Sequence, residues 1–187
     1  MTTPELLVSS TYEIELHKHR FAAWAAGRAA SVAPHRFKVE TGRAILEECG
    51  FTVELARPMQ LPAPSEIDEE HRRWRNEISA CAASRHLSLT HGVAAKLINI
   101  YLKSRFVCGG FHADERVESL HPPIDRVLLV TLAKRNVSGY GKEWRAAATR
   151  GWSNFGSDEY EGLIHRIRLS MAGAALWKVE EHWQGNQ

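Results

Sequence analysis

Residues 89–106, LTHGVAAKLINIYLKSRF, lie at the middle of the 187-residue chain and contain no proline. Their apolar residues recur every three or four positions, which is the period of an α-helix with one buried face. The pattern predicts a half-buried helix over residues 91–106. The predicted buried face carries Val93, Leu97, Ile100 and Tyr101, and the predicted polar face carries Lys96, Asn99 and Lys103.

The same period predicts helices along most of the remaining chain, so the fold class is expected to be all-α or nearly so. Alternation typical of a strand occurs in residues 51–55. Gly139 and Gly141 are expected to break the chain, and residues 108–123 to form a loop. Four further helices are predicted at residues 12–31, 39–49, 158–172 and 174–182. Two more have a predicted N-cap residue. One is capped by Ser65 or Asp68 and ends at Ser84, and the other covers residues 126–133 with Asp125 as its N-cap.

The length of the chain predicts a single helical domain. Three prolines fall within residues 57–65, which predicts an extended linker. If this linker separates two parts, residues 1–56 form an N-terminal helical lobe and residues 66–187 form the main lobe.

The composition is that of an ordinary globular protein, with 44% hydrophobic and 25% charged residues. No uncharged apolar stretch approaches the roughly 20 residues that cross a bilayer, and residues 1–10 lack the basic start of a signal peptide. Cys49, Cys81 and Cys108 are scattered without a CxxC motif, as is typical of reduced intracellular thiols. We therefore expect a cytoplasmic protein without membrane association.

The net charge of +2 is too small to indicate a nucleic acid partner, so the distribution of charge matters. Residues 134–150 hold five cations and one carboxylate, and Arg72, Arg73 and Arg75 form a second cluster. Each cluster is interpreted as a phosphate-facing patch or as a solvated helix face. The ten histidines do not fall at ligand spacing and include no HExxH motif, so we expect neither a metal nor a cofactor.

The start of the central helix carries features expected of a phosphate contact. Gly92 allows a tight turn and the close approach of a ligand, and the first N–H groups of a helix have no partner within the helix. Such a turn holds a DNA backbone without reading its sequence. The residues predicted to bind the backbone are Thr90, His91, Gly92 and Val93.

Two segments resemble the helix-hairpin-helix DNA glycosylase superfamily, including its 8-oxoguanine glycosylase branch. They are GVAAK at residues 92–96 and PIDRVLL at residues 123–129. In that family a glycine-containing hairpin is followed by a lysine, and an aspartate later precedes a helix. Lys96 falls at the lysine position and Asp125 at the aspartate position. The resemblance implies a helical, glycosylase-like domain that binds double-stranded DNA and excises a damaged or modified base.

The chain departs from the family pattern at several places. The proline and the second glycine of the hairpin are replaced, with Thr90-His91 and Ala94 near those positions. The lysine and the aspartate are 29 positions apart, with residues 107–120 as an apparent insertion. The C-terminal cysteine cluster of some members is absent.

The resemblance also implies a mechanism. Lys96 would attack the anomeric carbon of the sugar as a neutral amine, and Asp125 would stabilise charge on the sugar or accept the proton of the nucleophile. A Schiff base then permits strand cleavage, so the lysine implies an associated lyase activity. The flipped base would stack on aromatic side chains of a pocket. The candidates are Trp74, Phe106, Trp144 and Trp152.

Other interpretations of the same residues remain open. Asp125 alone is explained by helix capping, and Lys96 alone by a solvated helix face. A non-catalytic helical module that binds DNA or a protein partner is the second hypothesis. The third is a ribonuclease similar to the HEPN family, because Arg85 and His91 match its arginine–histidine spacing.

Overall fold

The computed structural model describes residues 12–185, so residues 1–10, considered above for a signal peptide, lie outside the described part. Within that part the chain contains helices and no strand, which confirms the all-α fold class. No helix of residues 12–185 is both long and apolar enough to cross a bilayer. The α-helices are α1 (Ile14–Ala30), α2 (Val39–Glu48), α3 (Ile67–Ala83), α4 (His91–Leu102), α5 (Glu115–Glu118), α6 (Arg126–Lys134), α7 (Gly141–Arg150) and α8 (Ser157–Met171). The short or irregular helices are Pro58–Gln60, Lys103–Phe111, Val137–Gly139, Trp152–Asn154 and Leu176–His182.

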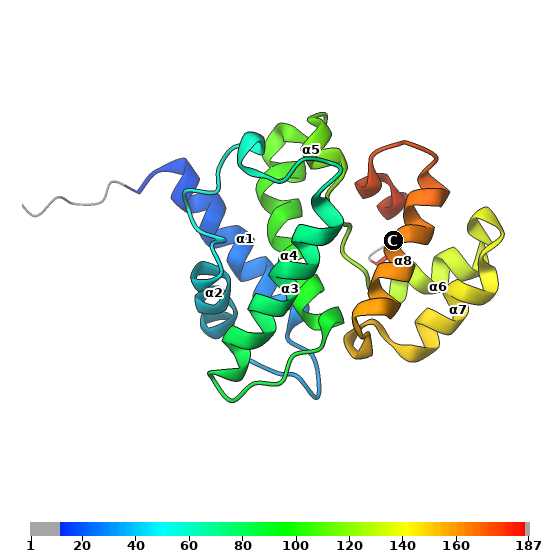
Figure 1. Cartoon of the computed structure of the whole chain (residues 1–187), viewed down its shortest axis with the longest axis horizontal. Coiled ribbons are helices and arrows are strands. Elements are labelled where there is room, and N and C mark those ends of the chain that lie inside the picture. The colour runs from blue at the N-terminus through cyan, green and yellow to red at the C-terminus, as the bar shows by residue number, and fades with distance from the viewer. Residues whose placement is uncertain (1–11, 186–187) are drawn as a thin grey trace, which may run out of the picture.

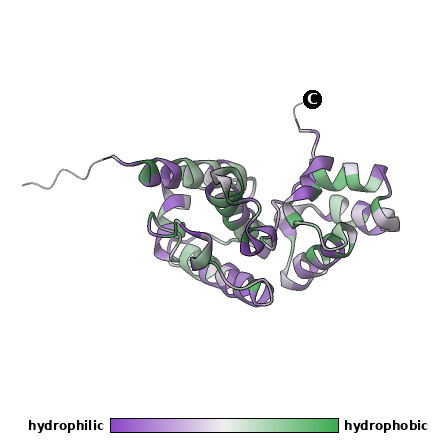
Figure 2. Ribbon diagram, turned by 90° about the horizontal axis from the view of Figure 1, so that it is seen from above, coloured by the Kyte–Doolittle hydropathy of each residue, from purple (hydrophilic) through white to green (hydrophobic). Residues whose placement is uncertain are grey.

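The helices form two groups, α1–α5 and α6–α8, that lie side by side (Figure 1). Each group surrounds its own cluster of buried apolar residues, and hydrophobic residues occur throughout both groups (Figure 2). The first cluster draws its residues from positions 22–120, and the second from Ala95 and positions 124–179. The predicted boundary at residues 57–65 does not coincide with this division, because Phe51 and Trp74 on either side of it pack edge to face at 5.3 Å.

Helix α4 is the centre of the fold. It contacts α1, α2, α3 and α8, and every residue from 92 to 99 is buried. The prediction of a half-buried helix is therefore wrong, since Lys96 and Asn99 of the expected polar face are also buried. The helical path continues through Lys103–Phe111, beyond the predicted end at Phe106, and Gly110 then reverses the backbone direction with a φ of 95°.

Small residues allow the first two helices of this group to approach closely. Ala22, Ala23 and Ala26 of α1 are fully buried. A Cβ on Gly42 of α2 would lie 3.3 Å from the Cα of Gly27 in α1, so the two glycines mark the point where these helices cross. Side chains this short leave the backbones of packed helices near the lower limit of their usual separation.

The predicted strand at residues 51–55 is a turn. The guanidinium of the buried Arg105 donates to the carbonyls of Val53 and Leu55 and to the carbonyl of Glu15 in α1. Carbonyls that a neighbouring strand would have paired are thus satisfied by one side chain from another part of the chain. The apolar side chains that alternate in residues 51–55 are buried or partly buried, but the segment does not pair with a strand among the described residues.

Several predicted boundaries also differ from the observed ones. Helix α7 begins at Gly141, which was expected to break the chain, because the Asn136 side chain accepts the N–H of Gly141 at 2.9 Å. A Cβ at that glycine would lie 2.5 Å from the same oxygen, so glycine is required there. Helix α5 occupies part of the predicted loop 108–123. Glu66 is the N-cap residue of α3, where Ser65 or Asp68 was expected. Leu176–His182 is a 3₁₀ helix, where an α-helix from residue 174 was expected.

We predict that Arg105→Ala lowers the free energy of unfolding by about 3 kcal/mol, because it removes hydrogen bonds from a charged donor to several buried carbonyls. Urea unfolding followed by circular dichroism measures the change. Arg43→Ala, which removes an exposed pair with Glu47 within α2, is the matched control and should change stability by less than about 0.5 kcal/mol. Equal effects of the two substitutions would contradict the role assigned to Arg105.

Candidate functional site

Lys96 and Asp125, 29 positions apart, are brought together where the two apolar clusters meet. The Nζ atom of Lys96 lies 3.4 Å from Oδ2 of Asp125. The other carboxylate oxygen, Oδ1, accepts the backbone N–H of Leu128 at 2.9 Å, which confirms Asp125 as the N-cap of α6. Asp125 therefore caps a helix and pairs with an amine at the same time, so the capping interpretation does not exclude a chemical role.

Two tryptophans complete this group, which we call the Lys96 site: Lys96, Asp125, Trp152 and Trp183. The Lys96 ammonium lies 5.5 Å from the centre of the Trp152 ring. The indole N–H of Trp183 donates to Oδ2 of Asp125 at 2.8 Å. The Lys96 side chain is 6% exposed and that of Asp125 is 23% exposed, whereas Trp183 is 39% exposed. The indole of Trp183 is thus the most accessible part of the site.

Burial lowers the pKa of the Lys96 amine below its ordinary value. The negative charges of Asp125 and Glu180 oppose this effect, because both favour the protonated amine. A lysine with a lowered pKa has a larger neutral fraction at physiological pH, and the neutral amine is the form that attacks carbon. The site therefore contains a potential nucleophile and a carboxylate that can accept its proton.

The turn before α4 does not offer the N–H groups of Gly92 and Val93 to a ligand, which argues against the backbone-binding role predicted for Thr90, His91, Gly92 and Val93. The N–H of Gly92 donates to the carbonyl of Phe155, and the N–H of Val93 donates to the Thr90 hydroxyl oxygen. A Cβ on Gly92 would lie 1.8 Å from the carbonyl oxygen of Trp152. The glycine thus allows residues 152–155 to pack against the turn, a contact between protein segments that occupies the predicted phosphate site.

Three of the four predicted base-pocket aromatics belong to the apolar clusters. Trp74 and Phe106 are buried in the first cluster and Trp144 in the second, where its indole N–H donates to the carbonyl of Val137. These residues therefore pack the core, and Trp74 also borders a hollow beside α3, away from the Lys96 site. Trp152, the fourth, is partly buried and lies against Lys96.

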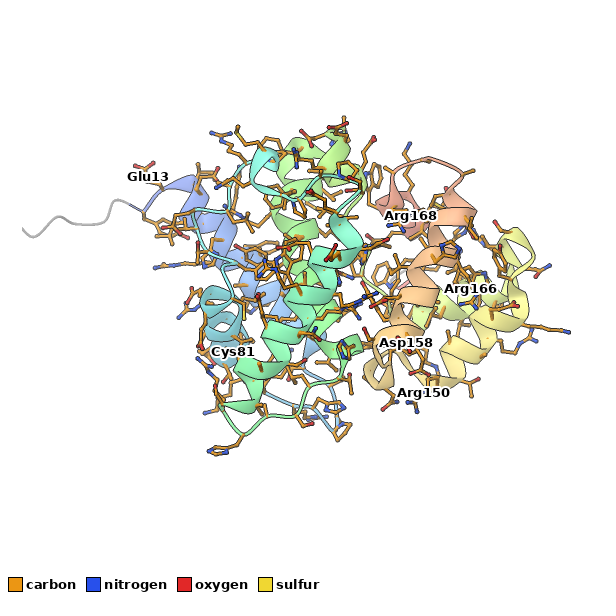
Figure 3. The ribbon with its side chains drawn as sticks, in the orientation of Figure 1. Glu13, Cys81, Arg150, Asp158, Arg166 and Arg168 are labelled. Atoms are coloured by element: carbon orange, nitrogen blue, oxygen red, sulfur yellow. The ribbon has the colours of Figure 1, made fainter. Side chains whose placement is uncertain are left out.

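A chain of buried polar groups, which sequence reasoning missed, joins α3, α4 and α8. The N–H and O–H groups of its members point in one direction when both histidines are neutral: His71 donates to Asn99, Asn99 to the hydroxyl of Tyr160, Tyr160 to His121, and His121 to Asp68. We call these five residues the polar chain. Asp68 also accepts two hydrogen bonds from Arg168 of α8, a residue labelled in Figure 3. No motif marks this group, because its members are scattered from position 68 to position 160.

The arginine cluster at residues 72–75 is neutralised by carboxylates within the chain. Arg75 is fully buried, donates to Glu161 and lies 4.6 Å from the Tyr160 ring centre. Arg72 also pairs with Glu161, and Arg73 pairs with two glutamates of its own helix. This cluster is therefore part of the packing between α3 and α8 and not a phosphate-facing patch.

The two residues of the ribonuclease hypothesis have separate surroundings. The Arg85 guanidinium pairs with Glu48 of α2 and donates to the Cys81 sulfur. His91 is half-buried, its Nδ1 has no hydrogen-bond partner within residues 12–185, and burial lowers its pKa. Neither residue is in the Lys96 site.

Comparison with known proteins gives no family assignment. The sequence matches no protein-family model and no curated protein, and the fold matches no solved structure. Among residues 12–185, no group of three or more histidine, cysteine, aspartate or glutamate side chains has a geometry that would hold a metal ion. The site must therefore be interpreted from its own contacts.

Gly92→Ala is predicted to lower the free energy of unfolding by about 1–3 kcal/mol, because the new methyl group overlaps the backbone of Trp152. The control is Gly162→Ala within α8, where the added Cβ would meet the end of the flexible Arg166 side chain at 3.4 Å. Alanine favours helix over glycine, so the control should be neutral or stabilising. Thermal unfolding without any DNA distinguishes the two, and an undisturbed Gly92→Ala protein would contradict the packing role.

The pH dependence of stability should report on the polar chain. Burial lowers the pKa of His71 and of His121, so both stay neutral in the folded protein at pH values where the unfolded chain binds protons. The contribution of the two neutral histidines to the free energy of unfolding is constant above the ordinary histidine pKa of about 6.5, and it is lost as the pH falls below that value. The pKa of Asp68 is lowered by its bonds to His121 and Arg168, so a second loss follows below about pH 4.

The test is urea unfolding between pH 8 and pH 5. Each neutral histidine contributes a slope of up to about 1.4 kcal/mol per pH unit, so His71→Gln should reduce the slope by about that amount. His165→Gln alters an exposed histidine of α8 and should leave the slope unchanged. Identical slopes in the native protein and His71→Gln would refute the neutral, buried state of His71.

Proposed function

We propose that the protein is a DNA glycosylase that excises a damaged or modified base with Lys96 as nucleophile and Asp125 as its partner. One observation carries this proposal: a buried amine with a lowered pKa lies 3.4 Å from a carboxylate contributed by a different segment. The order of the two residues in the chain also agrees with the resemblance described above. Their meeting in space removes the simplest objection to the proposal, that each residue only serves its own helix.

In the proposed reaction the neutral Lys96 amine attacks the anomeric carbon of a flipped nucleotide. The bond from this carbon to the base breaks, and the base leaves with the electron pair and takes up a proton. Asp125 accepts the proton released by the attacking nitrogen. The sugar ring then opens: its oxygen leaves the anomeric carbon and takes back the proton held by Asp125, and a protonated imine remains between Nζ and that carbon. Loss of a proton from the neighbouring carbon, C2′, then breaks the bond between C3′ and its phosphate oxygen, and the phosphate leaves with the electron pair. The lyase step thus follows from the same amine.

The tryptophans of the Lys96 site have distinct roles in this proposal. Trp183 holds the Asp125 carboxylate through its N–H, and its exposure makes it the side chain that the incoming nucleotide displaces. Trp152 supplies an aromatic surface beside the amine, where a flipped sugar or base can pack. The backbone of the DNA has to be held elsewhere, because the turn at Gly92 is occupied by residues 152–155.

We predict that Lys96→Ala abolishes covalent trapping by borohydride on duplexes that contain damaged bases, because no amine remains to form the imine. Asp125→Asn should slow base release by about 100-fold, the usual effect of removing a proton acceptor. Lys178→Ala, which alters an exposed lysine of the segment Leu176–His182, should behave like the native protein. Thermal unfolding confirms that the variants are folded before they are assayed.

The result that overturns the proposal is trapping that survives Lys96→Ala, or a native protein that neither traps nor releases a base from any of a panel of lesions. In the second case a non-catalytic DNA-binding module becomes the better interpretation. The low exposure of Lys96 and the bond from Trp183 to Asp125 favour that alternative, since both close the site. Salt-dependent binding of undamaged duplex without base release would establish it.

A further inference from the structure

Helices α6 and α7 enclose a surface groove that includes Lys134 and Arg145 of the cation cluster at residues 134–150. They pack against each other, and the groove between them has a volume of about 500 Å³. Its lining combines small and apolar residues with cations. The lining residues are Arg126, Val130, Ala133, Lys134, Arg145, Ala148 and Thr149. This set of described residues includes no carboxylate.

The three cations of the groove, Arg126, Lys134 and Arg145, are exposed and free to bind an anion. Within residues 12–185 none of them forms an ion pair. Cations nearby are engaged instead: Arg150 pairs with Glu159, and Arg135 contacts His182. The groove therefore brings together three cations that have no carboxylate partner within residues 12–185.

The neighbouring groove between α7 and α8 has a different character. Its lining mixes both signs of charge, and three of its residues, Arg150, Asp158 and Arg166, are labelled in Figure 3. Glu143, the only carboxylate of α7, lines that groove. An anion is therefore favoured on one face of α7 and not on the other.

The dimensions of the cationic groove fit a nucleic acid backbone. Arg126 and Lys134 are eight residues apart on one helix, a separation of about 12 Å along its axis. Each strand of a duplex has one phosphate per about 3.4 Å along the duplex axis, so this length corresponds to three to four phosphates measured along that axis. Arginine and lysine side chains that contact phosphates position a backbone without reading its sequence, so contact through these cations would be independent of sequence.

We propose that the groove between α6 and α7 binds the phosphate backbone of duplex DNA. Arg126 directly follows Asp125, so a strand held along α6 passes the Lys96 site at the start of this helix. The choice of DNA rests on the proposed function, whereas the capacity to hold phosphates rests on the cations of the groove. The groove supplies the backbone contact that the Gly92 turn cannot make.

The experiment measures binding of a fluorescein-labelled, undamaged 20-base-pair duplex by anisotropy between 50 and 200 mM salt. The variant Lys134→Ala/Arg145→Ala should weaken binding at least 10-fold at the lowest salt, and its salt slope should fall by about 0.9 for each phosphate that the variant no longer neutralises. The control Arg36→Ala/Lys38→Ala removes the same charge from the hollow beside α1 and α2, where Arg28 also lies, and should leave the slope unchanged.

The proposal is overturned if both double variants weaken binding equally, because net charge would then explain the effect. It is also overturned if the groove variant binds like the native protein, if the native protein does not bind the duplex, or if it binds vesicles containing phosphatidylserine instead. A native protein that binds the duplex through the groove but releases no base from any lesion separates the failure of the proposed function from the failure of this inference.

Discussion

The burial of α4 on all sides is the constraint on which the rest of the structure depends. A helix in this position cannot turn its polar side chains to water, so each of them needs a partner from another element. Lys96 finds Asp125 at the start of α6, and Asn99 bonds to Tyr160 of α8 and to the carbonyl of Pro122. Asp125 and Tyr160 belong to the second group of helices. Asn99 thus ties the second group of helices to the first, and Lys96 adds an ion pair at the same junction.

Most helices can be predicted from the sequence, because their apolar residues recur with the helical period and their caps are local. The Asp125 cap and the pairing of Lys96 with Asp125 are also within reach. The burial of α4 cannot be predicted from the sequence, because whether its polar face meets water or another helix depends on elements distant in the chain. The same limit explains why the sequence does not predict the contact of Trp183 with Asp125 or the polar chain. Their residues have no characteristic spacing in the sequence. The sequence suggests a chain break at Gly141, whereas this glycine is the first residue of α7, because the Asn136 side chain accepts its N–H.

Gly92 illustrates how one residue type satisfies two different physical requirements. A glycine at a helix start suits close approach by a phosphate and close approach by another segment of the protein equally well. An N–H group that already donates to the Phe155 carbonyl is not available to an anion. The Gly92 N–H therefore cannot contact a phosphate, whereas the unpaired cations of α6 and α7 are exposed and can. The occupied turn at Gly92 and the exposed cations of the groove both agree with a backbone contact made at α6 and α7 rather than at the start of α4.

The energetics of the Lys96–Asp125 pair bear on whether it serves the fold or a reaction. Burying two charges costs several kcal/mol per ion, and apolar residues of similar volume are often as stabilising in such positions. The polar chain around Asn99 already specifies how α4, α8 and the segment at His121 meet, so the ion pair is not needed for that purpose. Asp125 would still cap α6 if position 96 held an apolar residue. Burial keeps this amine beside the cap of α6 and lowers its pKa, and this is the arrangement on which the proposed function rests.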